Sequence, residues 1–236
     1  MRQRKVKNLD EKLGALAEYI VANPEENKGK WREFFGNNKP IYVEIGCGKG
    51  QFISKLAREN RVGNYIAIEG QDSVALRAAE KAKALTEETD IDNLVVMIKF
   101  VNDLTELFDN GEIDGIYLNF SDPWPKDRHD KRRLTHRERI QSYIKVLKQG
   151  GFIDVKTDNN DLFEFTLEEF AALELPYSAW TPDLHGHAAH YRQISPMLLG
   201  PNEHHILKAA DTTTEYEDKF MEQGLPINYV KVEKLW

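Results

Sequence analysis

Short apolar segments alternate with helical patterns along most of the chain. Pro40 precedes an apolar run at residues 41–45, which leads through a glycine-rich turn into a helical pattern at residues 51–60. Alternation of this kind predicts an α/β fold of the Rossmann-like, doubly wound type, with a mostly parallel sheet. Further strands are expected at residues 65–68, 94–100, 115–120, 152–156 and 227–232, the last of them an antiparallel C-terminal edge strand. Further helices are expected at residues 10–22, 73–85, 103–109, 137–147, 162–173 and 214–223.

The length of the chain fits a single domain. An α/β unit with modest extensions accounts for all 236 residues, and neither an internal repeat nor a low-complexity linker divides them. We therefore expect one domain over residues 1–236. Two parts stand apart from the alternating pattern: residues 1–9, expected to form a basic flexible arm, and residues 181–211, rich in Pro, His and Gly and expected to form a long loop.

Composition excludes several classes of protein. No apolar run approaches the roughly 20 residues of a membrane-spanning helix, and the basic start of the chain lacks the apolar stretch of a signal peptide. Cys47 is the single cysteine, so neither an internal disulfide nor a thiolate metal site is possible. Five of the seven histidines lie between residues 185 and 205 without the spacing of a metal site. We therefore expect a cytoplasmic protein with no metal and no membrane partner.

Charge is distributed unevenly along the chain. The net charge is −7, yet residues 1–7 hold four basic and no acidic side chains, and residues 126–139 hold seven basic and three acidic ones. Two basic segments on an acidic body predict a directed surface for a polyanion. The alternative for each segment is an ordinary solvated surface.

The glycine-rich turn is the first motif that suggests chemistry. It reads Glu44-x-Gly46-x-Gly48-x-Gly50, whereas the dinucleotide fingerprint G-x-G-x-x-G would require its third glycine at position 51. Glycines let the backbone turn tightly and approach a ligand closely. The spacing therefore favours an adenosyl cofactor with a methionine tail over a nicotinamide dinucleotide. Turn formation alone is the alternative.

Polar side chains follow the next two predicted strands. Glu69 ends the run 65–68, where an acidic side chain can accept hydrogen bonds from both hydroxyls of a ribose. This role does not distinguish an adenosyl cofactor from NAD. Asn102 and Asp103 follow the third strand, where they could contact an adenine amino group or cap the short helix after them.

A polar corner follows the predicted strand 115–120. Pro123 and Pro125 stop the strand and place Asp122 at the carboxyl edge of the sheet, where open α/β folds hold ligands. Trp124 could stack on a nucleobase or support the corner. The second basic segment follows at once, so that a candidate reaction centre and a candidate phosphate-binding surface adjoin.

Taken together, these motifs resemble the bacterial tRNA (guanine-N7)-methyltransferases. The resemblance rests on residues 44–50, 68–69, 117–126, 128–135, 156–159 and 214–217, and it extends over nearly the whole chain. It implies the class I methyltransferase fold and transfer of a methyl group from S-adenosyl-L-methionine to N7 of a guanine in the variable loop of tRNA. Gly70, Gln71 and Asp72 depart from the bulkier apolar or basic residues of the family, which predicts altered packing beside the adenine.

The resemblance also implies roles for individual residues. Asp122 would lie at the junction of cofactor and substrate as the catalytic residue. Cofactor contacts are expected from Glu44, Gly46, Gly48, Gly50, Glu69, Asn102, Asp103 and Asp122. Substrate contacts are expected from Lys126, Asp158, Thr214, Glu215, Tyr216 and Glu217, and RNA contacts from Arg128, His129, Asp130, Lys131, Arg132 and Arg133.

The expected chemistry depends on positioning. Guanine N7 carries an in-plane lone pair and no proton, so it can attack the sulfonium methyl without a strong base. Asp122, together with Asp158, is expected to accept hydrogen bonds from the N1–H and the N2 amino group and to offset the developing positive charge. Two alternatives stay open: methylation of another RNA base position, and an NAD-dependent oxidoreductase. The expected partner is tRNA and not DNA, with a homodimer as an open option.

Overall fold

The computed structural model describes residues 6–236. Residues 1–5, and with them most of the predicted basic arm, lie outside the described residues. Within the described chain, seven strands form one sheet in the order β3-β2-β1-β4-β5-β7-β6. The strands are β1 (Ile41–Ile45), β2 (Asn64–Glu69), β3 (Leu94–Ile98), β4 (Ile113–Asn119), β5 (Leu147–Thr157), β6 (Tyr177–Thr181) and β7 (Asn228–Glu233).

The sheet is mixed, as predicted. Strands β1 to β5 pair in parallel, whereas β7 runs antiparallel to β5 on one side and to β6 on the other. The α/β fold and the antiparallel C-terminal strand are therefore confirmed. One detail is corrected, because β6 pairs with the outer side of β7 and takes the edge position itself. Strand β6 is absent from the predicted strands.

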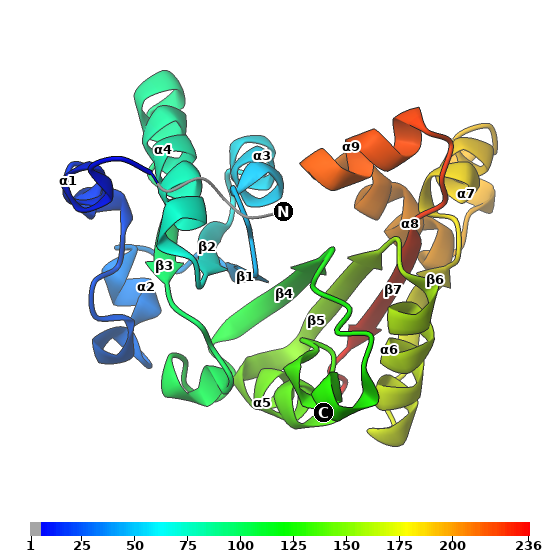
Figure 1. The fold of residues 1–236 in the computed structure, drawn as a ribbon. Coiled ribbons are helices and arrows are strands. Elements are labelled where there is room, and N and C mark those ends of the chain that lie inside the picture. The colour runs from blue at the N-terminus through cyan, green and yellow to red at the C-terminus, as the bar shows by residue number, and fades with distance from the viewer. Residues whose placement is uncertain (1–5) are drawn as a thin grey trace.

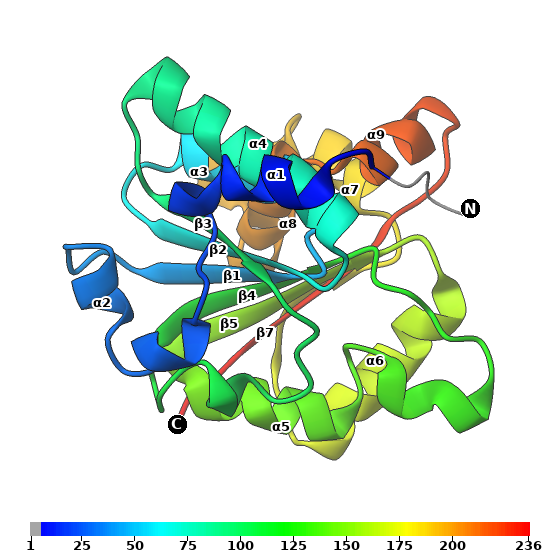
Figure 2. The same cartoon turned by 60° about the vertical axis from the view of Figure 1, so that its left-hand side comes forward.

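Helices cover both faces of the sheet (Figures 1 and 2). One face carries α3 (Gln51–Glu59), α4 (Asp72–Thr89), α7 (Leu184–Tyr191) and α8 (Pro201–Asp211), with α1 (Leu9–Gly14) outside α4. The other face carries α2 (Trp31–Phe34), α5 (Arg137–Val146) and α6 (Asn160–Ala172). Helix α9 (Glu215–Glu222) lies near the end of the sheet at which β4 terminates.

Alternating side chains of the central strands supply a core on each face. In β2, Ile66 and Ile68 join the core beneath α5 and α6, whereas Tyr65 and Ala67 join the core beneath α3 and α4. All four are almost completely buried. A strand buried on both faces reads as a continuous apolar run, which is why the sequence pattern predicts these strands well.

The prediction of a long loop at residues 181–211 is wrong. Most of this segment forms α7 and α8, joined by a short 3₁₀ turn at Pro196–Leu198. Leu184 and Ala188 of α7 and Ile206 and Ala210 of α8, each pair spaced by one helical turn, pack into a third core beside β6 and β7. Frequent histidines and prolines conceal this helical spacing, although Pro201 stands at the start of α8, where proline favours a helix.

The predicted helix at residues 10–22 is shorter in the structure. Helix α1 ends at Gly14, and a separate 3₁₀ turn spans Ala17–Tyr19. Glycine is a poor helix residue, so the break falls where the apolar pattern alone would continue the helix. Among the described residues, no helix is both long enough and apolar enough to cross a membrane.

Candidate active site

A cavity of about 680 Å³ opens at the carboxyl ends of β1, β2 and β4. Because β1 lies between β2 and β4 in the sheet, its end is the point at which the strand order reverses. Ligands of open α/β sheets bind at such switch points. The wall is formed by five groups of residues: 44–52 without Gly50, 68–71, 99–102, 119–124 without Pro123, and 214–216, with isolated side chains from α4, α5, α9 and the basic segment.

The glycine turn forms one wall of the cavity. Gly46 and Gly48 have φ angles of 73° and 57°, which favour glycine, and both line the cavity. Gly50 also has a positive φ, but a Cβ there would lie 2.8 Å from the Cβ of Ala78 in α4. The third glycine therefore lets α3 pack closely on α4, and the structure places it outside the cavity wall.

Glu44 and Asn119 form a buried polar pair at the base of the cavity. The Asn119 side chain donates to Glu44 Oε1 at 2.8 Å. Within the described chain, Glu44 Oε2 and Asn119 Oδ1 have no hydrogen-bond partner. Burial raises the pKa of Glu44 to about 8. Unpaired buried oxygens are costly, so their presence in a cavity wall indicates a site that a polar ligand completes.

Glu69 is oriented by backbone donors. Gly48 N donates to one carboxylate oxygen at 3.1 Å, and Gln71 N donates to the other at 2.9 Å. Burial raises the pKa of Glu69, the backbone hydrogen bonds oppose the rise, and the charge of Asp122 adds to it. Each carboxylate oxygen keeps a further acceptor position for a ligand hydroxyl.

The corner that carries Asp122 has an unusual backbone. Phe120 and Trp124 have φ angles of 50° and 41°, a region that residues with a Cβ rarely adopt. Such strained positions concentrate at functional sites and persist only where surrounding contacts hold them. Here they turn the chain twice within five residues, and Asp122 lies exposed in the wall of the cavity between them.

Arg133 is the contact that holds this corner. Its guanidinium donates to the carbonyl oxygens of Pro123 at 3.0 Å and Trp124 at 3.2 Å, and it lies 4.3 Å from the ring centre of Phe165. Among the residues predicted to face RNA, Arg133 thus differs in that its Nε and Nη2 donate to the backbone of the corner. The sequence cannot distinguish it from Arg132, which is exposed and lies 4.9 Å from the ring centre of Trp124.

An aromatic stack that the sequence reading missed borders the cavity. The ring centre of Phe120 lies 6.3 Å from that of Tyr216 and 6.1 Å from that of Phe220, with interplanar angles of 25° and 11°. Phe120 and Tyr216 both line the cavity, and so does Trp124. The sequence does offer a signal for this stack, which is the aromatic residue Phe120 at the point where the chain turns out of a buried strand.

The start of α9 contributes to the cavity wall. Thr214 caps the helix, and Thr214, Glu215 and Tyr216, three of the residues predicted to contact substrate, line the cavity. Glu215 forms an ion pair of 2.9 Å with Lys49 of the glycine turn. This exposed pair brings the substrate-side segment against the cofactor-side loop.

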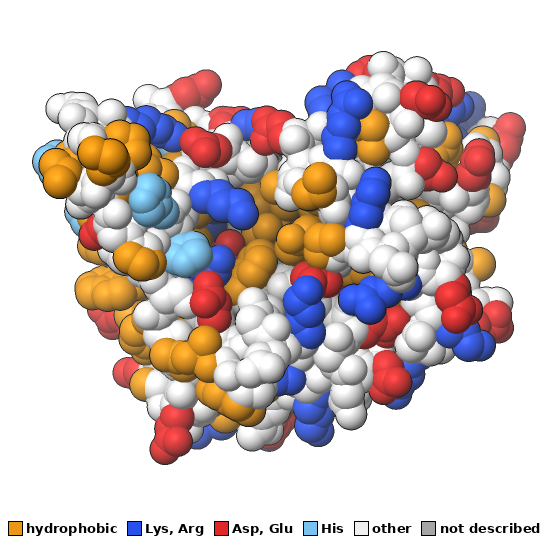
Figure 3. Space-filling model, turned by 180° about the vertical axis from the view of Figure 1, so that it is seen from behind, with side chains coloured by type: hydrophobic (Ala, Val, Ile, Leu, Met, Phe, Trp, Pro, Cys, Tyr) orange, Lys and Arg blue, Asp and Glu red, His pale blue; other side chains and the backbone are white. Residues whose placement is uncertain are grey.

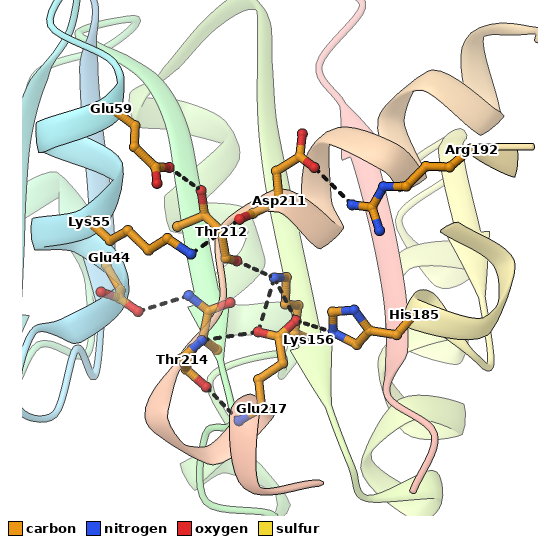
Figure 4. A network of polar contacts seen from close by, with 11 residues as sticks. Glu44, Lys55, Glu59, Lys156, His185, Arg192, Asp211, Thr212, Thr214 and Glu217 are labelled. Atoms are coloured by element: carbon orange, nitrogen blue, oxygen red, sulfur yellow. Dashed lines mark hydrogen bonds and ion pairs between the residues drawn. The ribbon is translucent and has the colours of Figure 1, made fainter. Parts of the chain in front are cut away.

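Glu217 has a different place from the one predicted. Its side chain is fully buried and lies 3.0 Å from Lys156 Nζ and 2.7 Å from His185 Nε2 (Figure 4). Thr214 N also donates to this carboxylate. Lys156 donates in addition to the carbonyl oxygen of Thr212, and burial lowers its pKa. The carboxylate of Glu217 therefore attaches α9 to β5 and α7. Because it is fully buried, it is not accessible to a substrate.

Several other predicted residues lie outside the cavity wall. The Asp103 side chain accepts from Thr105 N at 2.9 Å and caps a 3₁₀ turn, the alternative to an adenine contact. Asn102 does line the cavity, and Arg139, a cavity residue that the sequence reading missed, donates to its Oδ1. Lys126 and Asp158 are exposed beyond the wall. No group of three or more candidate metal ligands occurs among the described residues.

Comparison with known proteins places this site in a family. A family model described as "Putative methyltransferase" matches residues 38–229. The chain is 43% identical to the tRNA (guanine-N(7)-)-methyltransferase of Lachnoclostridium phytofermentans over 97% of its own length and 96% of the relative. It is 41% identical to the same-named protein of Streptococcus sanguinis, with 98% of each chain covered. The chain belongs to the tRNA (guanine-N7-)-methyltransferase family. The predicted resemblance is thereby confirmed.

Solved structures agree on the fold. The 16S rRNA methyltransferase KamB superposes with a TM-score of 0.61 at 10% identity, covering 87% of this chain and 93% of that one. An antibiotic-related methyltransferase superposes with a TM-score of 0.58 at 16% identity, covering 86% and 92%. At these identities the likeness concerns the fold alone, which is that of the class I methyltransferases.

Membership of this family makes the chain an enzyme whose cofactor is S-adenosylmethionine. The residues present fit that group. The glycine turn leaves room for close backbone approach, Glu69 has acceptor positions for ribose hydroxyls, and Glu44 and Asn119 present unpaired buried oxygens. Carboxylate and amide oxygens suit the amino group of a methionine tail.

The buried carboxyl of Glu44 predicts a pH-dependent stability. A carboxyl whose pKa rises from 4.5 in the unfolded chain to about 8 in the folded one takes up a proton on folding. Its favourable contribution to the free energy of unfolding is therefore lost as pH rises through that range. Glu44→Gln cannot titrate. In urea unfolding of the ligand-free protein, the free energy of unfolding of the variant should rise relative to that of the wild type by roughly 1 kcal/mol per pH unit between about pH 5 and 8. Glu168→Gln, at an exposed position, is the control. A difference that is constant with pH would contradict the assignment.

The Glu217 network predicts a second stability effect. Glu217→Ala leaves the Lys156 ammonium buried without its partner and should lower the free energy of unfolding by about 3–5 kcal/mol. Lys156→Met combined with Glu217→Leu should recover much of that loss, because no charge stays buried. The exposed pair of Lys83 and Glu87 is the control, and Glu87→Ala should cost less than about 1 kcal/mol. Equal losses in Glu217→Ala and Glu87→Ala would show that the buried pair has no special weight.

Proposed function

We propose that this chain transfers the methyl group of S-adenosylmethionine to N7 of a guanine in the variable loop of tRNA. One observation carries the proposal: Asp122 lines the same cavity as Glu44 and Glu69, and as Thr214 to Tyr216. One cavity therefore joins an exposed carboxylate to residues suited to a nucleoside and to residues from the start of α9. The relatives with this name are similar to the chain over almost its full length. The proposed setting is the cytoplasm, in agreement with the single cysteine.

The cofactor region is supplied by the first two strands and the end of the fourth. Glu69 would accept hydrogen bonds from the ribose hydroxyls, and Glu44 with Asn119 would hold the amino end of the methionine tail. The bound cofactor supplies a methyl group on a positively charged sulfur. Gly46 and Gly48 let the backbone lie against it without a side chain between them.

The substrate region is supplied by the corner and the start of α9. Asp122 would accept hydrogen bonds from the N1–H and N2 amino group of guanine, which turns N7 toward the cofactor. A planar base would find aromatic partners in Tyr216 and Trp124, both in the cavity wall. Since N7 has no proton to lose, orientation and a compensating negative charge are the contributions that the chain needs to make.

Exposed basic side chains beside the corner suit the phosphates of an RNA. Lys126, Arg128, Lys131 and Arg132 are exposed on one continuous segment, although Lys131 already pairs with Glu138 at 2.8 Å. Contacts of this kind position a nucleic acid without reading its sequence. On the face seen from behind, hydrophobic side chains lie in a central hollow, and Lys and Arg alternate with Asp and Glu around it (Figure 3). That face carries no patch of a single charge sign. The direction from which RNA would approach is therefore inferred from the basic segment.

The role of Asp122 is tested by Asp122→Ala. Methyl transfer from labelled cofactor to bulk tRNA should fall by about 100-fold or more in kcat, because the base is no longer oriented. Cleavage of the product at N7-methylguanine identifies the methylated atom and distinguishes N7 from an exocyclic amine. Asp127→Asn, an exposed acid outside the cavity wall, is the control and should keep wild-type kcat. Near-normal turnover of Asp122→Ala with saturating tRNA would exclude this role, and a methyl group at another atom would exclude the proposed reaction.

The RNA surface is tested by the salt dependence of KM. Lys126→Ala combined with Arg128→Ala should raise KM for tRNA and lower the slope of log KM against log salt by about 1.5, with kcat little changed. Arg77→Ala combined with Lys83→Ala on the exposed side of α4 removes the same charge away from the cavity. If both double variants change the slope equally, net charge alone accounts for the effect and the segment makes no direct phosphate contact.

A further inference from the structure

Phe100 is an exposed aromatic residue in the wall of the cavity. Its exposed fraction is 75%, the third largest among the large hydrophobic residues of the described chain, and it follows the end of β3 by two residues. Its ring lies over Gly70: a Cβ at position 70 would be 2.3 Å from two carbons of the ring. The ring therefore fills the space that a side chain after Glu69 would take.

The neighbourhood of Phe100 is that of the base of a bound nucleoside. Glu69 and Ile98 are paired neighbours in β2 and β3, and Lys99 N donates to Glu69 O at 3.0 Å. A ribose whose hydroxyls are held by Glu69 extends its base from the adjoining carbon, toward residues next to Glu69 and toward the end of the adjacent strand. Those residues are Gly70 and the segment 99–102, all of which line the cavity.

We propose that Phe100 provides the stacking surface for the adenine of the cofactor, and that Gly70 makes room for its ring. The inference rests on the proposed function for the identity of the ligand. An apolar ring that is three-quarters exposed in ligand-free protein gains contact area when a planar base covers it. Arg139 donates a hydrogen bond to Oδ1 of Asn102 and holds this side chain near Phe100, so a polar group adjoins the same base. An aromatic ring from the segment after β3 thus fills the space that a side chain in the turn after β2 would take.

Gly70 supplies a second way to test the ring. Its backbone is not in the left-handed region, so Gly70→Ala meets no conformational strain of its own. The three atoms nearest to the added methyl all belong to the Phe100 ring, which is exposed and can swing away. The two residues should therefore act as one unit, and a substitution at either position should remove the same stacking surface.

The test is calorimetric binding of S-adenosylhomocysteine to the full chain. Phe100→Ala should weaken binding by about tenfold, and Phe100→Tyr should restore it. Gly70→Ala should weaken binding as well, whereas Gly70→Ala added to Phe100→Ala should have no further effect. Leu198→Ala, which removes a side chain of similar exposure outside the cavity, should bind as the wild type does. The melting temperatures without ligand should agree, because the ring is largely exposed.

Three results would overturn the inference. Unchanged affinity of Phe100→Ala for S-adenosylhomocysteine would exclude stacking, and a raised KM for tRNA in that variant would then assign the ring to RNA. Additive losses in the double variant would show that Gly70 and Phe100 act separately. A wild type that does not bind S-adenosylhomocysteine would overturn this inference and the cofactor assignment together. By contrast, a wild type that binds it but does not methylate tRNA would contradict the proposed function alone.

Discussion

The parallel pairing of β1 with both β2 and β4 is the constraint on which the site depends. In this register Glu44 lies beside Ala67 and Tyr117, and the carboxyl ends of the three strands meet at one edge of the sheet. Glu44, Glu69 and Asn119, far apart in sequence, thereby face one cavity. Each strand is buried on both faces, so a shift by one residue would exchange the side chains of the two cores and disrupt the packing of both. The same burial that stabilises the sheet therefore sets the positions of the polar groups at its end.

A second constraint attaches the C-terminal part to this sheet. The buried contact of Lys156 in β5 with Glu217 in α9 attaches the start of α9 to the sheet (Figure 4). Thr214, Glu215 and Tyr216 thereby line the same cavity as Glu69. An ion pair taken out of water is not a strong source of stability, but it tolerates few arrangements because each charge must keep its partner. Its value here is positional: the pair, with His185 and the Thr214 cap, determines where Thr214 and Tyr216 lie.

The basic segment holds side chains in two kinds of environment that a charge pattern does not separate. Arg133 is directed inward and holds the carbonyl oxygens of the strained corner, whereas Lys126 and Arg128 are exposed to solvent. Substitution of neighbouring residues should therefore have unlike effects, on the geometry of Asp122 in the first case and on electrostatic attraction in the second. Phe100 and Gly70 show a similar dependence on neighbours, because the ring of Phe100, after β3, occupies the space over Gly70, after β2.

The sequence by itself determined the strand and helix alternation, the glycine turn, and the acidic residues at strand ends, because these follow from local periodicity and from residue types with few backbone options. It also determined the family, through motifs spread over nearly the whole chain. Only the tertiary structure decided that residues 184–211 form helices, that Gly50 serves packing, that Asp103 caps a turn, and that Glu217 and Arg133 are directed inward. These outcomes depend on which partner lies opposite each side chain, and partners distant in sequence are brought together only by the packing of the whole sheet with its helices.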